Sequence, residues 1–549
     1  MEAALQQILN GLGLPTNRML LFGPGPPPEG AGPNNIPRGG GGPGTKQVFE
    51  FHGCYYHGCP TCFTENRDKP TYDNTSETME TRYQNTIAKT ERLRNAGFSV
   101  IEKWECVFRR EMDTNTDIKQ YVENHPLLVN LPINPRDAFY GGRTDATKLY
   151  YEVKPGEKIK YIDVCSLYPY ICKTAKFPVG HPDVFVGDEC KNLNLNETDG
   201  LIKCKILPPT NLYHALLPVK MNDKLMFVLC RTCGEITSNT ECQHDDESRA
   251  LTSTWVIDEI LEAIRLGYRI LQIFEIWKYD VEVYNVDTKT GGLFTGYINK
   301  FLKTKLQASG WPENCNTLEE KHQYIADCND QMGVQLNFDE IEKNPALRQV
   351  GKDVITSFWG RMGLRENQSK TTVINSNPAL FFQMMTDPAI FINNILPIND
   401  KTLIVNWEFR DESYEILPTV NVCLAAYTTT LARLKLYSYL EKLGNRVLYH
   451  DTDSVVYISQ EDDNIDIPLG SMLGEMTNEL ECYGPNSYIT KFVSGGPKLY
   501  AYVVHSPSNN EYTEVCKVKG ICINHTVSKD VNFNKMRDMI LQNDPPLCL

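Results

Sequence analysis

Two short stretches of this chain set carboxylates at the ends of strand-forming residues. In KIKYIDVCSLYPYI (158–171), apolar residues alternate up to Asp163, which predicts a strand ending there; in RVLYHDTDSVVYIS (446–459), two β-rich runs flank Asp451 and Asp453. Mg²⁺ prefers a few carboxylates together with water and phosphate oxygens. Two such ions about 3.5–4 Å apart can activate an attacking hydroxyl and stabilise a leaving phosphate. Asp163 facing the hairpin tip would therefore suit phosphoryl transfer, although an Asp-Thr-Asp turn alone is commonly a solvated hairpin tip.

A basic helix lies between these two stretches. In ALRQVGKDVITSFWGRMG (346–363), Arg348, Lys352 and Thr356 follow one another at a spacing of four and so share one helix face. Two cations on one face suit a triphosphate, and Trp359-Gly360 would end the helix with an aromatic ring beside the reacting groups. The alternative is a surface helix that carries a few basic residues.

Cysteines and one histidine form a compact group in the middle of the chain. The spacing Cys230-x2-Cys233-x8-Cys242-x-His244 places four soft ligands within fifteen residues. Four protein ligands close a tetrahedral structural zinc site and leave no open position for chemistry. We therefore expect this group to bind Zn²⁺ and to support folding.

The elements that must position these residues divide the chain into several segments. A short apolar-periodic helix is expected over 1–22, and the Gly/Pro-rich stretch 23–46 is expected to be a linker. A helix is expected over 340–365, another over 425–443 that stops at Gly444, and a hairpin over 446–458. The region 190–335 carries this Cys/His group and several amphipathic helix patterns.

Composition narrows the class of protein. The chain has 549 residues, of which 41% are hydrophobic and 23% charged, as in ordinary globular proteins. No apolar run is long enough to cross a bilayer and no secretory signal is visible, so we expect an intracellular protein without a membrane partner. The net charge of −14 argues against nucleic acid as a partner, unless a basic groove lies within an acidic whole.

Five motifs in order resemble those of family B DNA polymerases, and most closely the protein-primed branch of Polinton (Maverick) elements and related viruses. They are Phe139-Tyr140-Gly141-Gly142-Arg143, Asp163-x-x-Ser166-Leu167-Tyr168-Pro169, Lys352-x4-Ser357-x-Trp359-Gly360, Tyr449-x-Asp451-Thr452-Asp453-Ser454 and Lys498-Leu499-Tyr500. The resemblance spans about 139–500. It implies an α+β right-hand polymerase with palm at 135–190 and 371–490, a terminal-protein-region-like insertion at 190–335, fingers at 336–370 and a whole or partial thumb at 491–549.

The resemblance also implies roles for individual residues. Asp163, Asp453 and the Val164 carbonyl would bind Mg²⁺ or Mn²⁺, with Asp451 beside them. Tyr168 would pack under the sugar and reject a 2′-hydroxyl, while Lys498 would contact the primer terminus. The family usually has Asn where this chain has Thr356, which would weaken nucleotide binding. The remaining substrate contacts would come from Tyr140, Gly141, Gly142, Ser166, Leu167, Arg348, Lys352 and Tyr500.

The segment 47–125 resembles very-short-patch-repair endonucleases, which have a restriction-enzyme-like fold with a structural zinc. The resemblance covers FEFHGCYYHGCPTCF (49–63) and Trp104-Glu105-Cys106, and implies Cys54, Cys59, Cys62 and Cys106 as zinc ligands. His52 and His57 match catalytic positions of that family, but the upstream Asp that such nucleases need is absent, since Asp68 is the first Asp. We therefore interpret the segment as an inactive accessory module in which both histidines are buried and bonded to backbone.

Proofreading is not expected, because the Asp-x-Glu pair of a family B exonuclease does not precede the first carboxylate motif. Asp280-Val281-Glu282 has that spelling but follows it. The resemblance implies primer–template DNA and dNTPs as substrates, a terminal priming protein as a partner, and a monomer located in the nucleus if a eukaryotic mobile element encodes it. Two alternatives stay open: an inactive mobile-element remnant that only binds DNA, and a zinc-stabilised nuclease.

Overall fold

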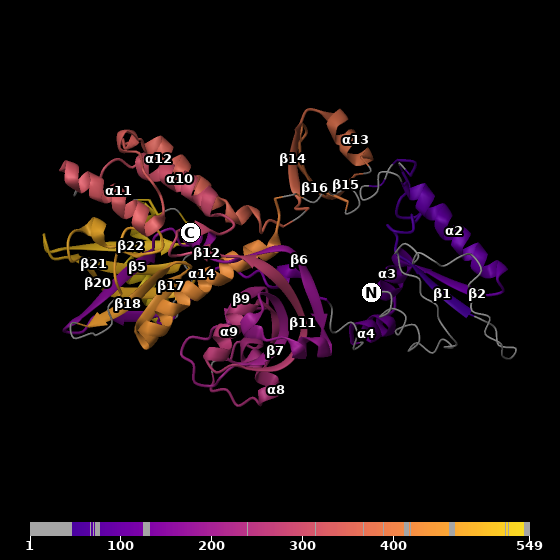
Figure 1. Cartoon of the computed structure of the whole chain (residues 1–549), viewed down its shortest axis with the longest axis horizontal. Coiled ribbons are helices and arrows are strands. Elements are labelled where there is room, and N and C mark those ends of the chain that lie inside the picture. The colour runs from indigo at the N-terminus through magenta and orange to yellow at the C-terminus, as the bar shows by residue number, and fades with distance from the viewer. Residues whose placement is uncertain are drawn as a thin grey trace. The chain divides into compact units, whose positions relative to one another are not determined.

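Figure 1 shows the computed structural model of the chain. It describes residues 47–542 except for gaps at 66, 70, 72–76, 125–131, 239, 313–314, 366, 388, 411–416, 418, 461–466, 522 and 525. The helix expected over 1–22 and the linker expected over 23–46 lie outside the described residues. Two compact units are present: Met1–Leu131 with Arg365–Ile416, and Pro132–Leu364 with Leu417–Leu549. Each is described by itself, and the fold of both is mixed α and β, as predicted.

A nine-stranded sheet is the centre of the second unit. Its order is β22-β21-β20-β5-β18-β17-β3, with β19 pairing to β5 and β4 pairing to β20. Strand β5 buries Ile162 and Val164 in a core that it shares with the long helix α14 (Val422–Leu443). Helix α14 ends at Gly444, as predicted, where φ is 52°. The strands are β3 (Thr144–Ala146), β4 (Tyr150–Glu152), β5 (Glu157–Val164), β17 (Val447–Asp451), β18 (Ser454–Gln460), β19 (Met476–Asn478), β20 (Tyr488–Gly496), β21 (Leu499–Ser506) and β22 (Glu511–Val518).

Two helices flank this sheet. Helix α6 (Leu167–Thr174) directly follows β5 and contacts α14. Helix α15 (Phe533–Gln542) packs on β20 and β21 through Phe533 and Met536.

A four-stranded antiparallel sheet, ordered β10-β7-β11-β6, fills much of the region predicted as an insertion. Its core is built around the fully buried Trp255, whose indole N–H donates to the carbonyl of Pro218 at 2.9 Å. The region 190–335 therefore combines this sheet with the helix α9 and with further helices, in keeping with the several helices predicted there. The elements are β6 (Phe177–Val186), β7 (Gly200–Leu207), β8 (Pro218–Met221), β9 (Lys224–Phe227), α7 (Arg231–Glu235), α8 (Asp246–Arg249), β10 (Leu251–Val256), α9 (Ile257–Arg265) and β11 (Arg269–Glu282).

Three helices share a separate apolar core formed by Ile298, Leu302, Cys328, Met332 and Ile355. They are α10 (Thr295–Gln307), α11 (Leu318–Met332) and α12 (Pro345–Ser357), and the short pair β12 (Tyr284–Asn285) and β13 (Thr290–Gly291) precedes them. Helix α12 begins with Pro345 after the cap Asn344, whose side chain accepts from the N–H of Leu347 at 3.1 Å. The predicted boundary between 190–335 and 336–370 thus runs through one packed helical group.

The first unit holds two small sheets. In one, β1 (Gln47–His52) pairs in parallel with β2 (Ser99–Trp104), beside α2 (Met79–Asn95), α3 (Glu105–Thr114) and α4 (Thr116–Asn124). In the other, β14 (Lys370–Asn375), β16 (Thr402–Phe409) and β15 (Ile390–Asn399) form an antiparallel sheet with α13 (Pro378–Thr386). The segment predicted as palm over 371–490 therefore divides, since its first part forms this separate sheet. Among the described residues, no helix is long and apolar enough to cross a membrane.

Candidate active site

The three predicted aspartates meet on neighbouring strands. Asp163, near the end of β5, lies opposite Ser454 of β18, and the N–H of Val164 donates to the carbonyl of Asp453 at 2.8 Å. The Asp-Thr-Asp turn is tight, because Thr452 has a φ of 58° and the N–H of Asp453 donates to the carbonyl of Asp451 at 2.6 Å. The strand and the hairpin tip predicted from the sequence thus come together.

Burial and like charges shift the titration of two of these groups. Burial, the neighbouring Asp453 and then Glu479 raise the pKa of Asp163 to about 8. Burial and then Asp451 raise the pKa of Asp453 to about 6, against an opposing effect of Lys498. Carboxylates crowded in this way fit the oxygen-rich, anionic donor set that a divalent cation prefers.

Asp451 is held differently from the other two. Its carboxylate accepts from the hydroxyl of Thr144 at 2.7 Å and pairs with the ammonium of Lys498 at 3.0 Å. The hydroxyl of Tyr449 lies 3.5 Å from it and also accepts from the backbone N–H of Lys498 at 2.9 Å. Asp451 is therefore neutralised by a cation of this chain, which leaves Asp163 and Asp453 as the better metal ligands. No sequence pattern pointed to Thr144 or Glu479, since both reach the site through pairing between distant strands.

The loop with the predicted template motif is joined to the Asp-Thr-Asp turn. The N–H of Thr452 donates to the carbonyl of Arg143 at 2.7 Å. A Cβ atom on Gly142 would lie 2.7 Å from the hydroxyl oxygen of Thr452, so only glycine allows this approach. Arg143 itself is buried, with its guanidinium 4.3 Å from the ring centroid of Phe227.

A buried ion pair fixes the same loop from behind. Arg433 of α14 forms two contacts of 3.0 Å with the carboxylate of Glu259 on α9. It also donates to the carbonyls of Tyr140 and Gly141, at 3.0 and 3.1 Å. Both charged side chains are at most 3% exposed, so the loop is anchored inside the protein.

Three predicted substrate residues are buried. Leu167 packs in the core under α14, and Tyr140 donates to or accepts from the hydroxyl of Ser253 at 2.6 Å. Tyr500 is 7% exposed, and its hydroxyl lies 3.3 Å from that of Tyr161. Their side chains therefore pack inside the protein, and substrate contact by these three residues stays a prediction. Gly141 and Lys498 are exposed, and Gly142 is half-buried.

The first carboxylate motif continues into a turn that presents an aromatic pair. Ser166 has a φ of 52° and precedes α6. Tyr168 stacks on Trp359, with ring centroids 4.2 Å apart and planes inclined by 25°. The ring predicted to lie under a sugar and the ring predicted to lie beside the reacting groups thus form one surface.

The predicted cation helix presents its polar face to solvent. Arg348, Lys352 and Thr356 are all exposed on α12, and the hydroxyl of Thr356 donates to the carbonyl of Lys352 at 2.9 Å. A further cation, Lys305 of α10, lies beside them: burial and then, among nearby cations, Arg348 and Lys352 lower its pKa. Gly351 makes this possible, because a Cβ there would lie 3.1 Å from the backbone nitrogen of Lys305. The sequence did not indicate Lys305, since nothing in it reveals the packing of α10 on α12.

The four side chains of the predicted Cys/His group lie close together in the second unit. Nδ1 of His244 lies 3.5 Å from the sulfur of Cys230, 3.3 Å from that of Cys233 and 3.6 Å from that of Cys242. All four ligand atoms lie within 4.8 Å of one another, so this group could hold a metal ion.

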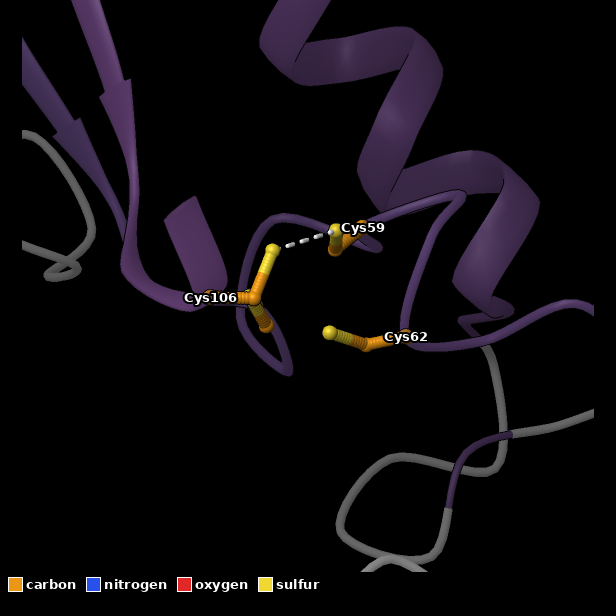
Figure 2. A group of neighbouring side chains, drawn as sticks. Cys59, Cys62 and Cys106 are labelled. Atoms are coloured by element: carbon orange, nitrogen blue, oxygen red, sulfur yellow. Dashed lines mark hydrogen bonds between the residues drawn. The ribbon is translucent and has the colours of Figure 1, made fainter. Parts of the chain in front are cut away.

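The four predicted cysteines of the first unit are gathered as well. Figure 2 shows Cys59, Cys62 and Cys106 around one space, with the sulfurs of Cys59 and Cys106 3.8 Å apart. With Cys54, their sulfurs lie within 4.8 Å of one another and could hold a second metal ion.

The two histidines of this unit bond to side chains, which corrects the expectation of backbone partners. Nε2 of His52 lies 3.2 Å from a carboxylate oxygen of Glu102, and Nδ1 of His57 lies 3.0 Å from the hydroxyl of Thr86. Burial lowers the pKa of both, that of His57 to about 4. The reason is the parallel pairing of β1 with β2, which brings Glu102 beside His52.

The chain is similar in sequence to proteins named as probable DNA polymerases and in structure to Phi29 DNA polymerase. Two curated proteins named "Probable DNA polymerase", from Podospora anserina and Neurospora intermedia, are each 22% identical to this chain, in alignments of 398 and 414 residues that cover 67% and 74% of it. The chain spans only 27% and 34% of their lengths. Phi29 DNA polymerase complexed with primer-template DNA and incoming nucleotide substrates is 16% identical, with a TM-score of 0.47, over 73% of this chain and 57% of that one.

A family model matches the part of the chain that holds the first two motifs. It is described as DNA polymerase type B, organellar and viral, and it matches residues 102–317. Over these residues, which include Asp163 and the loop around Gly142, the chain is similar to the type B DNA polymerases of organelles and viruses.

Proposed function

We propose that this chain carries out template-directed DNA synthesis, transferring a nucleotide from a dNTP to the 3′-hydroxyl of a primer. The observation that carries the proposal is the junction of Asp163, the Asp-Thr-Asp turn and the Gly142 loop on one edge of the nine-stranded sheet. Motifs that are about three hundred residues apart in the sequence meet there through backbone pairing. The similarity to organellar and viral type B polymerases supports the same function.

Divalent metal ions would be held by Asp163, Asp453 and the Val164 carbonyl. Mg²⁺ or Mn²⁺ bound there supplies activation of the primer hydroxyl and charge neutralisation on the phosphates. The raised pKa values of both aspartates, caused by burial and neighbouring carboxylates, support this assignment, since a cation offsets the repulsion.

The substrates would be positioned by groups around this edge. Arg348, Lys352 and Lys305 would attract the triphosphate of the incoming nucleotide. Tyr168, stacked on Trp359, would close the space where a 2′-hydroxyl would sit. Lys498, which pairs with Asp451, would contact the primer terminus. The hydroxyl of Thr356 is bonded to its own helix, so nucleotide binding would rest on the three cations.

The architecture that fits this function is a right hand. The nine-stranded sheet would be the palm, the helical group α10–α12 the fingers, and residues 491–549 the thumb. The segment 47–125 would be an endonuclease-like accessory module, and structural Zn²⁺ would occupy both cysteine groups.

The biological setting belongs to the same proposal. A terminal protein would supply the priming hydroxyl, as in Polinton-type elements, and the chain would act as a monomer. It would be intracellular, and nuclear when a eukaryotic mobile element encodes it.

Primer extension tests this proposal. The parent protein is expected to extend a labelled primer on a DNA template with dNTPs and Mg²⁺, and Asp453→Asn is expected to abolish extension. Asp280→Asn is the matched control, since Asp280 is an exposed carboxylate on β11. Asp453→Asn protein that extends the primer at the parental rate would refute the assignment. DNA binding by a folded parent that extends no primer would favour the inactive remnant.

A further inference from the structure

A cavity of about 430 Å³ lies between the β8–β9 hairpin, α7 and β10, away from the catalytic carboxylates. Tyr140, Lys203, Lys220, Arg231, Thr252 and Ser253 contribute to its lining. Lys220, Arg231 and Thr252 are exposed at its mouth, whereas Tyr140 is buried at its wall. Neither the metal groups nor the phosphoryl-transfer site uses these cations.

The charge of the lining favours a phosphodiester. Asp137 and Glu235 also line the cavity, so its three cations and two carboxylates leave a net charge of one. This balances a single phosphodiester group, whereas a free triphosphate carries several more charges. Hydroxyls and cations together are the groups by which proteins usually contact the nucleic-acid backbone.

The wall of the cavity is fixed by contacts that reach into the core. The hydroxyls of Tyr140 and Ser253 lie 2.6 Å apart. The ammonium of Lys220 lies 5.2 Å from the ring centroid of Tyr140 and donates to the carbonyl of Arg136 at 3.3 Å. Arg231 directly follows Cys230, so the Cys/His group anchors the backbone that carries this guanidinium.

The cavity is continuous with the loop of the proposed template contact. Tyr140 lines it and directly precedes Gly141 and Gly142, whose loop packs on Thr452 beside the catalytic aspartates. A strand that passes over this loop would therefore place its next phosphates at the mouth of the cavity. The chain is acidic overall, so a local set of cations of this kind is needed to hold DNA.

We propose that this cavity binds a backbone phosphate of the single-stranded template ahead of the catalytic site. The proposal rests on the proposed polymerase function, because it takes the DNA strand from it. Lys220 and Arg231 make the contact at the mouth, and Thr252 and Ser253 offer hydroxyls behind them.

Fluorescence anisotropy with two labelled DNA probes tests the proposal. One is a blunt duplex, and the other is the same duplex with a 5′ template overhang of about ten nucleotides. The variant Lys220→Gln/Arg231→Gln is expected to bind the overhang probe about tenfold more weakly, with a salt-dependence slope smaller by about 0.7, as for the loss of one phosphate contact. Binding of the blunt duplex is expected to stay unchanged. Lys224→Gln is the matched control, because Lys224 is exposed on the same hairpin but does not line the cavity.

The outcomes separate this proposal from the one it rests on. Equal weakening for both probes, or the same weakening in Lys224→Gln, would overturn the phosphate site. The proposal would also be overturned if free dNTP or inorganic pyrophosphate abolished the difference between parent and variant on the overhang probe. That result would mean that the cavity binds a free nucleotide. If the variant binds only the overhang probe more weakly, and the parent protein extends no primer, the phosphate site is supported and the proposed catalysis is rejected.

Discussion

The catalytic carboxylates differ in the charges that surround them. Lys498 pairs with Asp451, whereas Asp163 faces Asp453 and lies near Glu479. Because burial and these neighbours disfavour its charged form, Asp163 costs the folded protein free energy whenever it is ionised. The same negative charges that lower the stability of the folded protein therefore favour the binding of a divalent cation.

This imbalance predicts an unusual pH dependence of stability. The pKa of Asp163 is raised to about 8 in the folded protein, above its unfolded value of about 3.9, so the folded state binds more protons between these limits. The contribution of Asp163 to the free energy of unfolding therefore falls as pH rises through this range. In EDTA, Asp163→Asn is expected to gain about 1–3 kcal/mol at about pH 8, after allowance for solvent screening, and almost nothing near pH 4.

Urea unfolding at both pH values measures this gain. Asp280→Asn, on an exposed strand position, serves as the control and is expected to change neither value. Mg²⁺ should stabilise the parent more than Asp163→Asn. A variant less stable than the parent at the higher pH would show that Asp163 is not destabilising.

At the scale of elements, two ion pairs join α9 to α14 and differ in burial. Glu259–Arg433 is buried and holds the loop at Tyr140, whereas Arg265–Glu441 is exposed. Glu259→Gln leaves Arg433 without its charged partner and is expected to cost about 3–5 kcal/mol of unfolding free energy. Glu441→Gln breaks the exposed pair between the same helices and is expected to cost less than about 1 kcal/mol.

Chemical denaturation of both variants measures the difference. Under conditions in which it stays folded, Glu259→Gln should also bind template more weakly, because Arg433 no longer holds the loop at Tyr140 and Gly141 in place. Equal effects of the two substitutions would contradict the role given to the buried pair.

The contact between the template loop and the Asp-Thr-Asp turn predicts a steric effect. Gly142→Ala would place a Cβ 2.7 Å from the hydroxyl oxygen of Thr452, so the turn must shift. The rate of nucleotide incorporation is expected to fall by about tenfold or more, since small displacements of reacting groups are costly. Gly141→Ala is the control, because the nearest atom to its Cβ would be 3.9 Å away.

Rescue identifies the cause of the effect. Thr452→Ala removes the clashing atoms and should restore part of the rate in the Gly142→Ala background. A slow double variant, or an equally slow Gly141→Ala, would argue against the clash.

The sequence predicted elements whose signals are local. The hairpin at Asp451, the helix that carries Arg348 and the Cys/His group at Cys230 were each predicted from spacing within short segments. The four-cysteine group that includes Cys106 was predicted from a resemblance instead. Contacts between distant segments were not predictable in this way. Thr144 reaches Asp451 through the pairing of β3 with β17, and Lys305 reaches Arg348 through the packing of α10 on α12.

The sequence also did not predict which side chains of the motifs are buried. Tyr140, Leu167 and Tyr500 lie within motifs typical of substrate contact, yet their side chains are buried in the structure. In the region 190–335, the predicted helices are present as α9, α10 and α11, but the four-stranded sheet that contains Trp255 was not predicted.

At the scale of the whole molecule, each compact unit has, among its described residues, one Cys or Cys/His group that could hold a metal ion. Cys54, Cys59, Cys62 and Cys106 belong to the first unit, and the Cys/His group belongs to the second. Four soft ligands in each group favour zinc, and removal of one ligand weakens binding strongly. The two groups are therefore expected to load independently.

Elemental analysis of purified protein measures the zinc content. The parent is expected to contain about two zinc ions per chain, Cys106→Ser and Cys233→Ser about one each, and the double variant almost none. Cys482→Ser is the control, since Cys482 is exposed and belongs to neither group. Full loss of zinc from either single variant would contradict independent loading.

The central claim is that Asp163 and Asp453 act together in nucleotide transfer. Single-turnover incorporation of one templated dNTP, measured for both Asn variants and the double variant, tests it most directly. Each single variant is expected to lose at least about a thousandfold in rate, and the double variant no more than either one, because the pair acts as a unit. Parental rates in either single variant would contradict the account.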